Sequence, residues 1–268
     1  GNIQEAAKLY QYCINQGLKD HRVLSNYGAI LQGLGKLQDA ELSYRKAIEI
    51  KPNFAEAHSN LGNILRDLGK LKEAELSYRK AIKIKPNYAE AHSNLGNILK
   101  DHGKLENAEL SYRKAIELNP DLAVAHYNLG NILKDHGKLE DAELSYRKAI
   151  ELNPDLAEAH SNLGNTYKDL GKLKDAELSY RKAIELNPDF ATAYDNLGFI
   201  LSDLGKLKEL PQLSKSILKS KSINKGYKLL ASIRLTIANL LRGDFSETLL
   251  NINKTNNLIN QGAINTIN

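Results

Sequence analysis

Apolar and small residues recur along this chain at helical spacing, and the pattern is itself repeated. In residues 89–122, AEAHSNLGNILKDHGKLENAELSYRKAIELNPDL, apolar residues lie three and four apart in two blocks separated by Gly103. This spacing places them on one face of an α-helix. The stretch therefore predicts two amphipathic helices joined by a short turn.

The stretch recurs with a period of 34 residues, and near copies begin at Ala55, Ala123 and Ala157. Two glycine series and one proline series keep this step: Gly28, Gly62, Gly96, Gly130, Gly164, Gly198; Gly35, Gly69, Gly103, Gly137, Gly171, Gly205; Pro52, Pro86, Pro120, Pro154, Pro188. Such a period indicates a repeat array. One helix pair cannot bury its apolar stripe alone, so the pairs are expected to stack into a solenoid. Repeat positions are counted below from 1 at Ala55, Ala89, Ala123 and Ala157.

Each predicted helix has identifiable ends and a packing face. The glycine at position 15 is expected to stop the first helix in the left-handed conformation. Asn or Asp followed three residues later by Glu predicts a capping box at its start, as in Asn53/Glu56, Asn87/Glu90 and Asp155/Glu158. Small residues at positions 8, 20 and 27 allow two helices to approach, and the tyrosine at position 24 is expected to fill the remaining gap.

At these positions the chain resembles the tetratricopeptide repeat (TPR) family. The third full repeat carries the resemblance at Leu95, Gly96, Leu99, Ala108, Tyr112, Ala115 and Pro120. The string SNLGN…GKL…AELSYRKAI is most similar to the superhelical arrays that precede the catalytic domain of O-linked N-acetylglucosaminyltransferases. The resemblance implies an all-α, right-handed superhelical solenoid whose first helices line a concave groove, and a function in protein–protein interaction.

The repeats divide the chain into three predicted regions. Residues 1–20 are expected to form a lone second helix of a truncated repeat. The array covers 21–205, with repeats at 21–54, 55–88, 89–122, 123–156 and 157–190 and the first helix of a sixth from 191. Residues 206–268 are expected to form a divergent helical C-terminal cap, or a seventh pair out of register, and the stretch 255–268 has weak helix propensity.

Charge follows the same division. Residues 206–268 hold ten Lys and Arg against three Asp and Glu, a net charge of +7 that leaves −2 for the rest of this +5 chain. A basic tail can bind nucleic acid or lipid. Because aromatic residues do not interleave with these lysines, a solvated cap without nucleic acid is the preferred interpretation. No apolar run is long enough to span a bilayer, so we expect no membrane partner and a cytoplasmic location.

Asparagines form the strongest candidate site. The helical wheel places positions 6 and 9 opposite the core face, and the resemblance then implies that the groove floor carries Asn26, Asn60, Asn63, Asn94, Asn97, Asn128, Asn131, Asn162, Asn165 and Asn196. An asparagine amide both donates and accepts hydrogen bonds, so a row of them suits the backbone of an extended peptide. The alternative is that duplication copied asparagines that merely solvate the groove.

Charged residues flank these rows at positions 12 and 13: Lys100, Lys134 and Lys168, and Asp101, Asp135 and Asp169. They either pair with one another, are solvated, or contact a charged ligand. The family's carboxylate clamp requires Lys at position 5, where this chain has Ser59, Ser93, Tyr127, Ser161 and Asp195. The resemblance therefore implies that a chain-terminal carboxylate is not the ligand.

Neither a catalytic site nor a cofactor site is indicated. The histidines at position 4 (His58, His92, His126 and His160) occur once per repeat, and helix spacing of about 8–10 Å keeps them too far apart for a shared zinc ion. We expect them to pack in the core. The single cysteine, Cys13, has no partner for a disulfide. No nucleophile–base set or close carboxylate pair appears.

The second helices depart from the family pattern at positions 21 and 22. In the family position 21 is usually apolar and position 22 polar, whereas here position 21 is Glu and position 22 is Leu. Position 22 lies about 160° around the helix from the packing face. Leu76, Leu110 and Leu144 are therefore expected to form an outer ridge available for self-association, unless each packs against the adjacent repeat. The preferred function is a peptide-binding scaffold. The alternatives are the substrate-selecting region of a larger glycosyl- or other group-transferase, and a self-associating scaffold.

Overall fold

The computed structural model describes residues 2–241 and 243–262, and within these residues it contains helices and no strand. The predicted all-α class is confirmed. The chain forms two compact units, residues 1–132 and 133–268. Their boundary lies within helix α8 (Ala123–Asp135). The two units are described separately.

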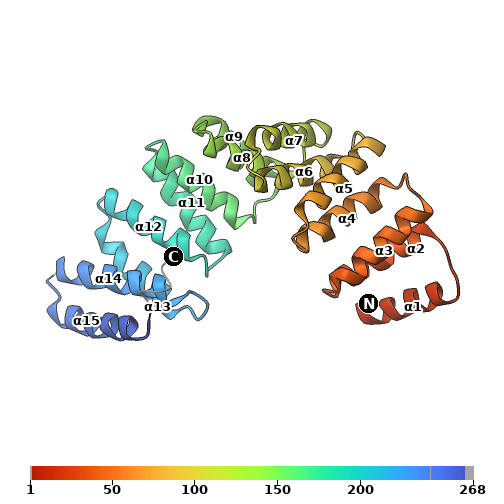
Figure 1. Cartoon of the computed structure of the whole chain (residues 1–268). Helices are drawn as coiled ribbons and strands as arrows, with labels where there is room; N and C mark the ends of the chain where they lie inside the picture. Colours follow the sequence, from red (N-terminus) through yellow and green to blue (C-terminus); the bar gives the residue numbers. More distant parts are fainter. Residues whose placement is uncertain (1, 242, 263–268) are drawn as a thin grey trace. The chain divides into compact units, whose positions relative to one another are not determined.

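The first unit consists of consecutive helix pairs (Figure 1). Its helices are α1 (Ile3–Asn15), α2 (His21–Gly33), α3 (Leu37–Ile50), α4 (Ala55–Asp67), α5 (Leu71–Ile84), α6 (Ala89–Asp101), α7 (Leu105–Leu118) and the start of α8. Helices α2/α3, α4/α5 and α6/α7 pack as hairpins, and α3 and α5 also contact the first helix of the next pair. Each of these hairpins corresponds to one predicted repeat, and contacts between hairpins join successive repeats.

The second unit continues with such pairs and ends differently. Its helices are α9 (Leu139–Leu152), α10 (Ala157–Asp169), α11 (Leu173–Leu186), α12 (Ala191–Asp203), a 3₁₀ turn (Leu207–Glu209), α13 (Leu210–Lys219), α14 (Lys225–Leu241) and α15 (Phe245–Asn260). Helix α13 packs chiefly on α14, which forms a hairpin with α15. Residues 255–260 belong to α15, whereas 263–268 of the predicted weak stretch lie outside the described residues.

A left-handed glycine ends each first helix, as predicted. Gly69 has φ +74°, its N–H donates to the Arg66 carbonyl over 2.9 Å, and the Lys70 N–H donates to the Leu65 carbonyl over 2.7 Å. These two bonds satisfy carbonyls that the helix itself leaves unpaired. A side chain with a Cβ would be strained at this φ. The glycine therefore fixes the turn between the two helices of a repeat.

The predicted capping boxes are wrong. Helix α4 begins one residue later than a cap at Asn53 requires, with Phe54 at the N-cap and no side-chain capping bond, and α6, α10 and α12 begin in the same way. The ring of Phe54 packs edge-on against His21, with centroids 4.9 Å apart. Glu56, freed from capping, lies 3.4 Å from the Lys85 ammonium.

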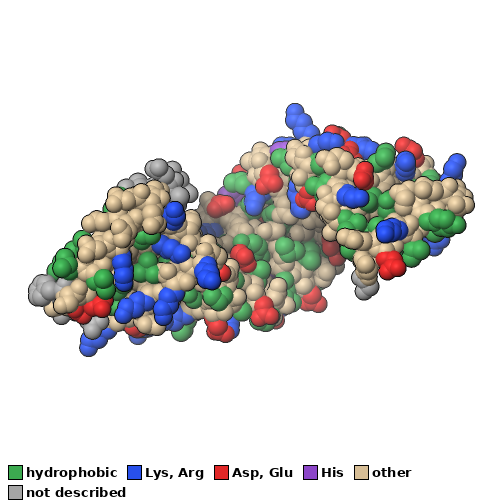
Figure 2. Space-filling model, turned by 90° about the horizontal axis from the view of Figure 1, so that it is seen from below, with side chains coloured by type: hydrophobic (Ala, Val, Ile, Leu, Met, Phe, Trp, Pro, Cys, Tyr) green, Lys and Arg blue, Asp and Glu red, His purple; other side chains and the backbone are tan. Residues whose placement is uncertain are grey.

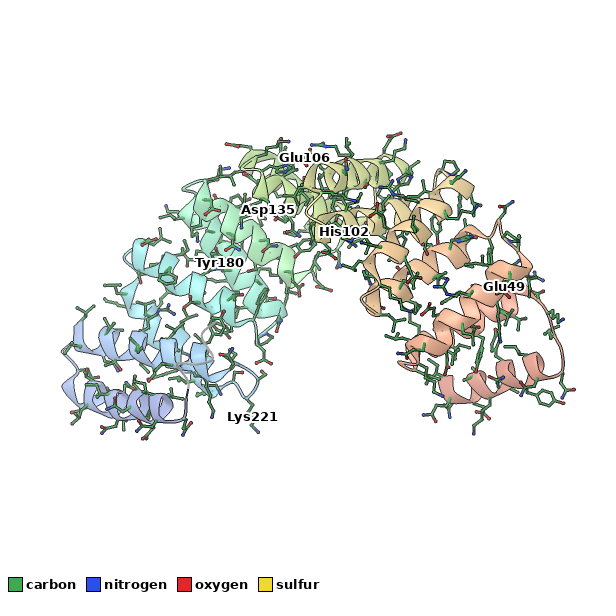
Figure 3. All side chains as sticks on the ribbon, viewed as in Figure 1. Glu49, His102, Glu106, Asp135, Tyr180 and Lys221 are labelled. Carbon is green, nitrogen blue, oxygen red and sulfur yellow. The ribbon has the colours of Figure 1, made fainter. Side chains whose placement is uncertain are left out.

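A glycine–tyrosine contact closes the hairpins α2/α3, α4/α5, α6/α7 and α10/α11. A Cβ on Gly96 of α6 would lie 2.7 Å from Cε1 of Tyr112 of α7, and one on Gly164 of α10 would lie 2.8 Å from Tyr180 of α11. Both rings are fully buried, and Tyr180 lies between its two helices (Figure 3). The predicted role of the position-24 tyrosine is thus confirmed, and only glycine leaves room for it.

Glutamates at position 21 link successive second helices. Glu41 lies 2.8 Å from both Arg45 on its own helix and Lys70 at the start of the next repeat, and Glu177 makes the same two contacts with Arg181 and Lys206. Burial raises the pKa of Glu41, but hydrogen bonds from Lys70 and Arg45 outweigh it and lower the pKa overall. Position 21 therefore joins repeats through ion pairs instead of apolar contact.

Candidate functional site

The two asparagine rows lie on the first helices at different depths. Asn60, Asn63, Asn94 and Asn97 are half-buried, as are Asn131, Asn162, Asn165 and Asn196. Asn26 is exposed, and Asn128 is 7% exposed. The helical-wheel prediction treated positions 6 and 9 as equivalent, whereas their hydrogen bonds differ.

Position 9 is an acceptor for two side chains. Oδ1 of Asn97 on α6 accepts a hydrogen bond from the Tyr112 hydroxyl at 2.7 Å and another from Nδ2 of Asn128 at 3.0 Å. The tyrosine belongs to the same repeat and Asn128 to position 6 of the next. Two further sets repeat the arrangement: Asn63 with Tyr78 (2.7 Å) and Asn94 (3.2 Å), and Asn165 with Tyr180 (2.7 Å) and Asn196 (3.0 Å).

These bonds fix the orientation of each amide. Because an amide oxygen has two lone pairs, the oxygen of Asn97 is saturated and both Nδ2 hydrogens remain for another partner. Asn128 uses one N–H and keeps its Oδ1 and its second N–H. Burial raises the pKa of Tyr112 far above the ordinary value of 10, so its hydroxyl remains a donor at every physiological pH. The sequence signal for this link was a tyrosine fifteen residues after each position-9 asparagine.

The hydrogen-bonded pattern has definite ends. Repeat one has Ala29 at position 9, so Asn60 of the next repeat has no oxygen of this kind to bond. At the other end Phe199 occupies position 9 of α12, and the row stops at Asn196.

The flanking charges pair in one repeat. The Arg66 guanidinium lies 3.2 Å from Asp67, whereas Asp101, Asp135 and Asp169 are exposed. Lys100 and Lys134 are half-buried and Lys168 is exposed. Position 5 faces inward, since Ser59 and Ser93 are each 2% exposed.

The repeated histidines stabilise the turn that precedes each first helix. Nε2 of His58 lies 2.9 Å from the Pro52 carbonyl, and His92, His126 and His160 make the same bond with the prolines six residues before them. Burial lowers the pKa of His58, which favours its neutral form. The expectation of simple core packing is corrected, because three of the four are only half-buried. Among the described residues no cluster of metal-ligating side chains occurs.

The outer leucines are exposed. Leu76 and Leu110 are 67% and 66% exposed in the first unit, and Leu144 is 65% exposed in the second. The alternative in which each packs against the adjacent repeat is therefore wrong. Lys and Arg gather over the C-terminal helices of the second unit on the face drawn in Figure 2, with few acidic side chains among them. No helix in 2–241 or 243–262 is long and apolar enough to span a bilayer.

Family models match most of the chain. One described as a TPR repeat matches residues 28–65, 62–103, 96–137 and 130–171, and two described as tetratricopeptide repeats match 157–190 and 179–209. The chain belongs to the tetratricopeptide repeat family. Proteins of this family mediate protein–protein interactions, and none of the matched models describes a catalytic domain. The likeness to the transferase arrays remains a comparison.

Solved TPR proteins share the fold. YrrB, described as a TPR protein with an unusual peptide-binding site, is 26% identical, covers 70% of this chain and 96% of its own, and aligns with a TM-score of 0.56. MamA is 27% identical over 62% of this chain and 96% of its own, with a TM-score of 0.54. PilF of Pseudomonas aeruginosa is 19% identical over 74% of this chain and 90% of its own, with a TM-score of 0.68, which bears on the fold alone. No curated protein matches the chain.

Proposed function

We propose that this TPR array binds an extended peptide segment of a partner protein along its first helices, through the two rows of asparagine amides. The observation that carries the proposal is the double hydrogen bond at position 9. Asn97 accepts from Tyr112 and Asn128, so its amide is held in one orientation before any ligand arrives. A preorganised donor loses less entropy on binding than a free side chain does.

The remaining polar groups match a peptide backbone. Position-9 asparagines offer Nδ2 donors to carbonyl oxygens, and position-6 asparagines offer Oδ1 acceptors to N–H groups. Neighbouring helices pack about 8–10 Å apart and an extended chain rises roughly 3.3 Å per residue, so each repeat meets about three peptide residues. Backbone contacts of this kind bind many sequences. YrrB, described as a TPR protein with an unusual peptide-binding site, supports the same class of ligand.

A peptide array tests this function. The parent chain and a triple variant, Asn94→Ala, Asn128→Ala and Asn162→Ala, are compared for binding to immobilised extended peptides. Each lost hydrogen bond is expected to weaken binding by about 0.5–1.5 kcal/mol, which amounts to more than tenfold for the three together. Circular dichroism shows whether the helices remain.

The matched control is Asn87→Ala, which changes an exposed asparagine in a turn outside both rows. It should bind as the parent does. If the triple variant retained the same peptides with the same strength, or if the parent bound no peptide, the groove proposal would be abandoned. The alternative role as the substrate-selecting region of a transferase remains a prediction.

A further inference from the structure

The outer face of the second helices carries a repeated apolar knob. The leucine row of the first unit consists of Leu42, Leu76 and Leu110, which are 53%, 67% and 66% exposed. The neighbouring position is filled by a glutamate that links adjacent repeats through ion pairs, as Glu41 does with Lys70. Packing between repeats therefore does not depend on these leucines. Burying one of them against a partner removes apolar surface from water, which is favourable.

Pockets lie beside these knobs, between successive second helices. A cavity of about 380 Å³ separates α3 from α5. Its apolar lining is Ile48, Leu61 and Leu76, and its polar lining is Arg45, Glu49, His58, Ser77 and Lys80. Its floor is apolar, and the leucine of the row forms one wall. The α3/α5 junction thus places a leucine knob next to a hole.

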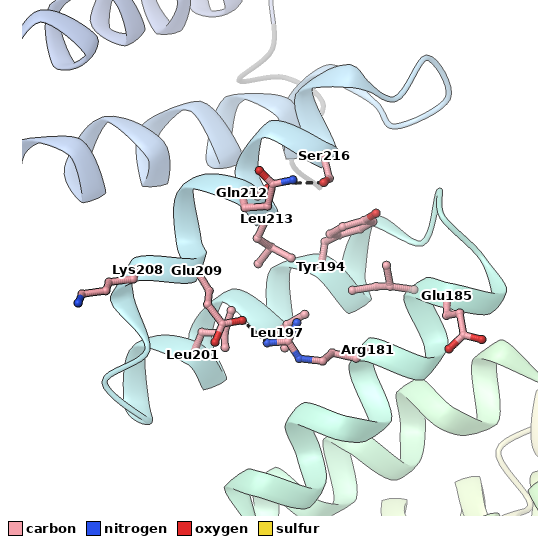
Figure 4. Close-up of a pocket in the computed structure, with 11 residues that line it drawn as sticks. Arg181, Glu185, Tyr194, Leu197, Leu201, Lys208, Glu209, Gln212, Leu213 and Ser216 are labelled. Atoms are coloured by element: carbon pink, nitrogen blue, oxygen red, sulfur yellow. Dashed lines mark hydrogen bonds and ion pairs between the residues drawn. The ribbon is translucent and has the colours of Figure 1, made fainter. Parts of the chain in front are cut away.

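The hole recurs at equivalent positions. Between α1 and α3, Ile14, Tyr27 and Leu42 stand where Ile48, Leu61 and Leu76 stand in the next junction, around about 180 Å³. The second unit has a hole at the equivalent place between α11 and α13, floored by Tyr194 and Leu197 of α12, with a volume of about 520 Å³ and with Gln212 at the leucine position (Figure 4). Leucines 144 and 178 of that unit, 65% and 66% exposed, supply its knobs.

Charge is arranged symmetrically about the leucines. One turn before Leu42 and Leu76 lie the exposed acids Asp39 and Glu73, and one turn after them the exposed lysines Lys46 and Lys80. Helices α3 and α5 therefore present acid, leucine and base in that order, whereas α7 has Asn107 in the place of the acid. If a second copy packs on this face with its second helices parallel to those of the first, acidic residues face acidic residues. A copy related by a two-fold axis that lies in the plane of the contact, perpendicular to the helices, puts acid on base and leucine beside hole.

We propose that two copies of this chain associate antiparallel through their second-helix faces, with the leucine row of one copy entering the holes of the other. The contact is isologous, because each surface supplies both the knobs and the holes. The asparagine rows on the first helices stay outside it. Peptide binding and self-association are therefore separate properties of the two faces.

Sedimentation over a concentration series tests the contact. The parent should shift from monomer to dimer mass as concentration rises, and Leu42→Ser, Leu76→Ser and Leu110→Ser together should keep it monomeric. The control is Leu241→Ser, a leucine 70% exposed on α14 outside the row. A monomeric parent at all concentrations, or an unchanged mass for the triple variant, overturns the proposal, as does dissociation by the control alone.

Charge reversal tests whether acidic flanks of one copy face basic flanks of the other. Changing Lys46→Glu and Lys80→Glu makes both flanks of the row acidic, and changing Asp39→Lys and Glu73→Lys makes both basic. Each variant alone should be monomeric, while an equimolar mixture should form heterodimers at least tenfold more tightly than either forms homodimers. Circular dichroism checks that both are folded. Equal association of each variant with itself and with the other would contradict this arrangement.

Discussion

Two notches in the second unit, the spaces left beside Gly164 and Gly198, are filled by different side chains. One belongs to a regular repeat and the other to the end of the array. In α10, Gly164 receives the ring of Tyr180 from α11. In α12, Gly198 keeps the notch, but position 24 is Ser214 on α13. A guanidinium from a different helix fills the space, with Nη1 of Arg234 2.8 Å from where a Cβ would lie.

The two fillings have different chemistry. Tyr180 is fully buried and extends its hydroxyl to Asn165, continuing the asparagine rows. Arg234 instead forms an ion pair with Asp195 at 2.6 Å and lies over the Phe199 ring, 5.2 Å from its centroid. Phe199 replaces the next position-9 asparagine. The comparison teaches that the tyrosine does two jobs, packing and amide orientation, and that both end where the arginine takes its place.

Replacing Tyr180 or Arg234 with alanine should show how much each side chain contributes to the free energy of unfolding. Tyr180→Ala is expected to cost about 3–5 kcal/mol of unfolding free energy, because it leaves a large cavity in a buried contact. Arg234→Ala should cost less, about 2–3 kcal/mol, because Asp195 then loses its partner but keeps some contact with water. Urea unfolding followed by circular dichroism and fitted to a nearest-neighbour repeat model measures both. Equal costs would mean that the notches are energetically alike.

Filling the notch from the glycine side should give the next largest contrast. Gly164→Ala places a methyl group 2.8 Å from the Tyr180 ring, and overpacking of about 1–3 kcal/mol exceeds the gain of about 1 kcal/mol in helix propensity. Gly198→Ala should be nearly neutral or stabilising, since the end of an arginine can move aside. Comparable destabilisation of the two variants in thermal unfolding would show that Arg234 is as rigidly held as Tyr180.

The smallest effect concerns the ion pairs between repeats. Burial raises the pKa of Glu177, but hydrogen bonds from Lys206 and Arg181 outweigh it and lower the pKa below its ordinary 4.5. Its contribution is therefore complete above pH 4.5 and is lost as pH falls through the lowered folded-state pKa. Glu177→Gln should cost below about 1 kcal/mol at neutral pH, and the difference from the parent should vanish in acid. Unfolding curves at several pH values measure it, and a difference that grew in acid would be evidence against this pairing.

Much of the regular part was predictable from the 34-residue period. Helix ends at glycines such as Gly103, the buried tyrosine and the exposed leucines all follow from position within one repeat. The hydrogen bond between Asn97 and Asn128 was not predictable in this way, because a helical wheel describes one helix and this bond joins two. The role of Arg234 was hidden for a similar reason, since it lies 36 residues beyond Gly198, outside the periodic match. The capping boxes failed because the helices begin one residue later, with an apolar or aromatic residue such as Phe54 at the N-cap in place of Asn53.

The central claim is that tyrosine-held asparagines present their Nδ2 groups to the backbone of a bound peptide. A crystal structure of the chain with a peptide selected on the array tests this most directly. The account predicts a peptide carbonyl within hydrogen-bond distance of Nδ2 of Asn97, while Oδ1 of that residue keeps its bonds to Tyr112 and Asn128. A peptide bound to Oδ1 of Asn97, or seated only between the second helices, would contradict it.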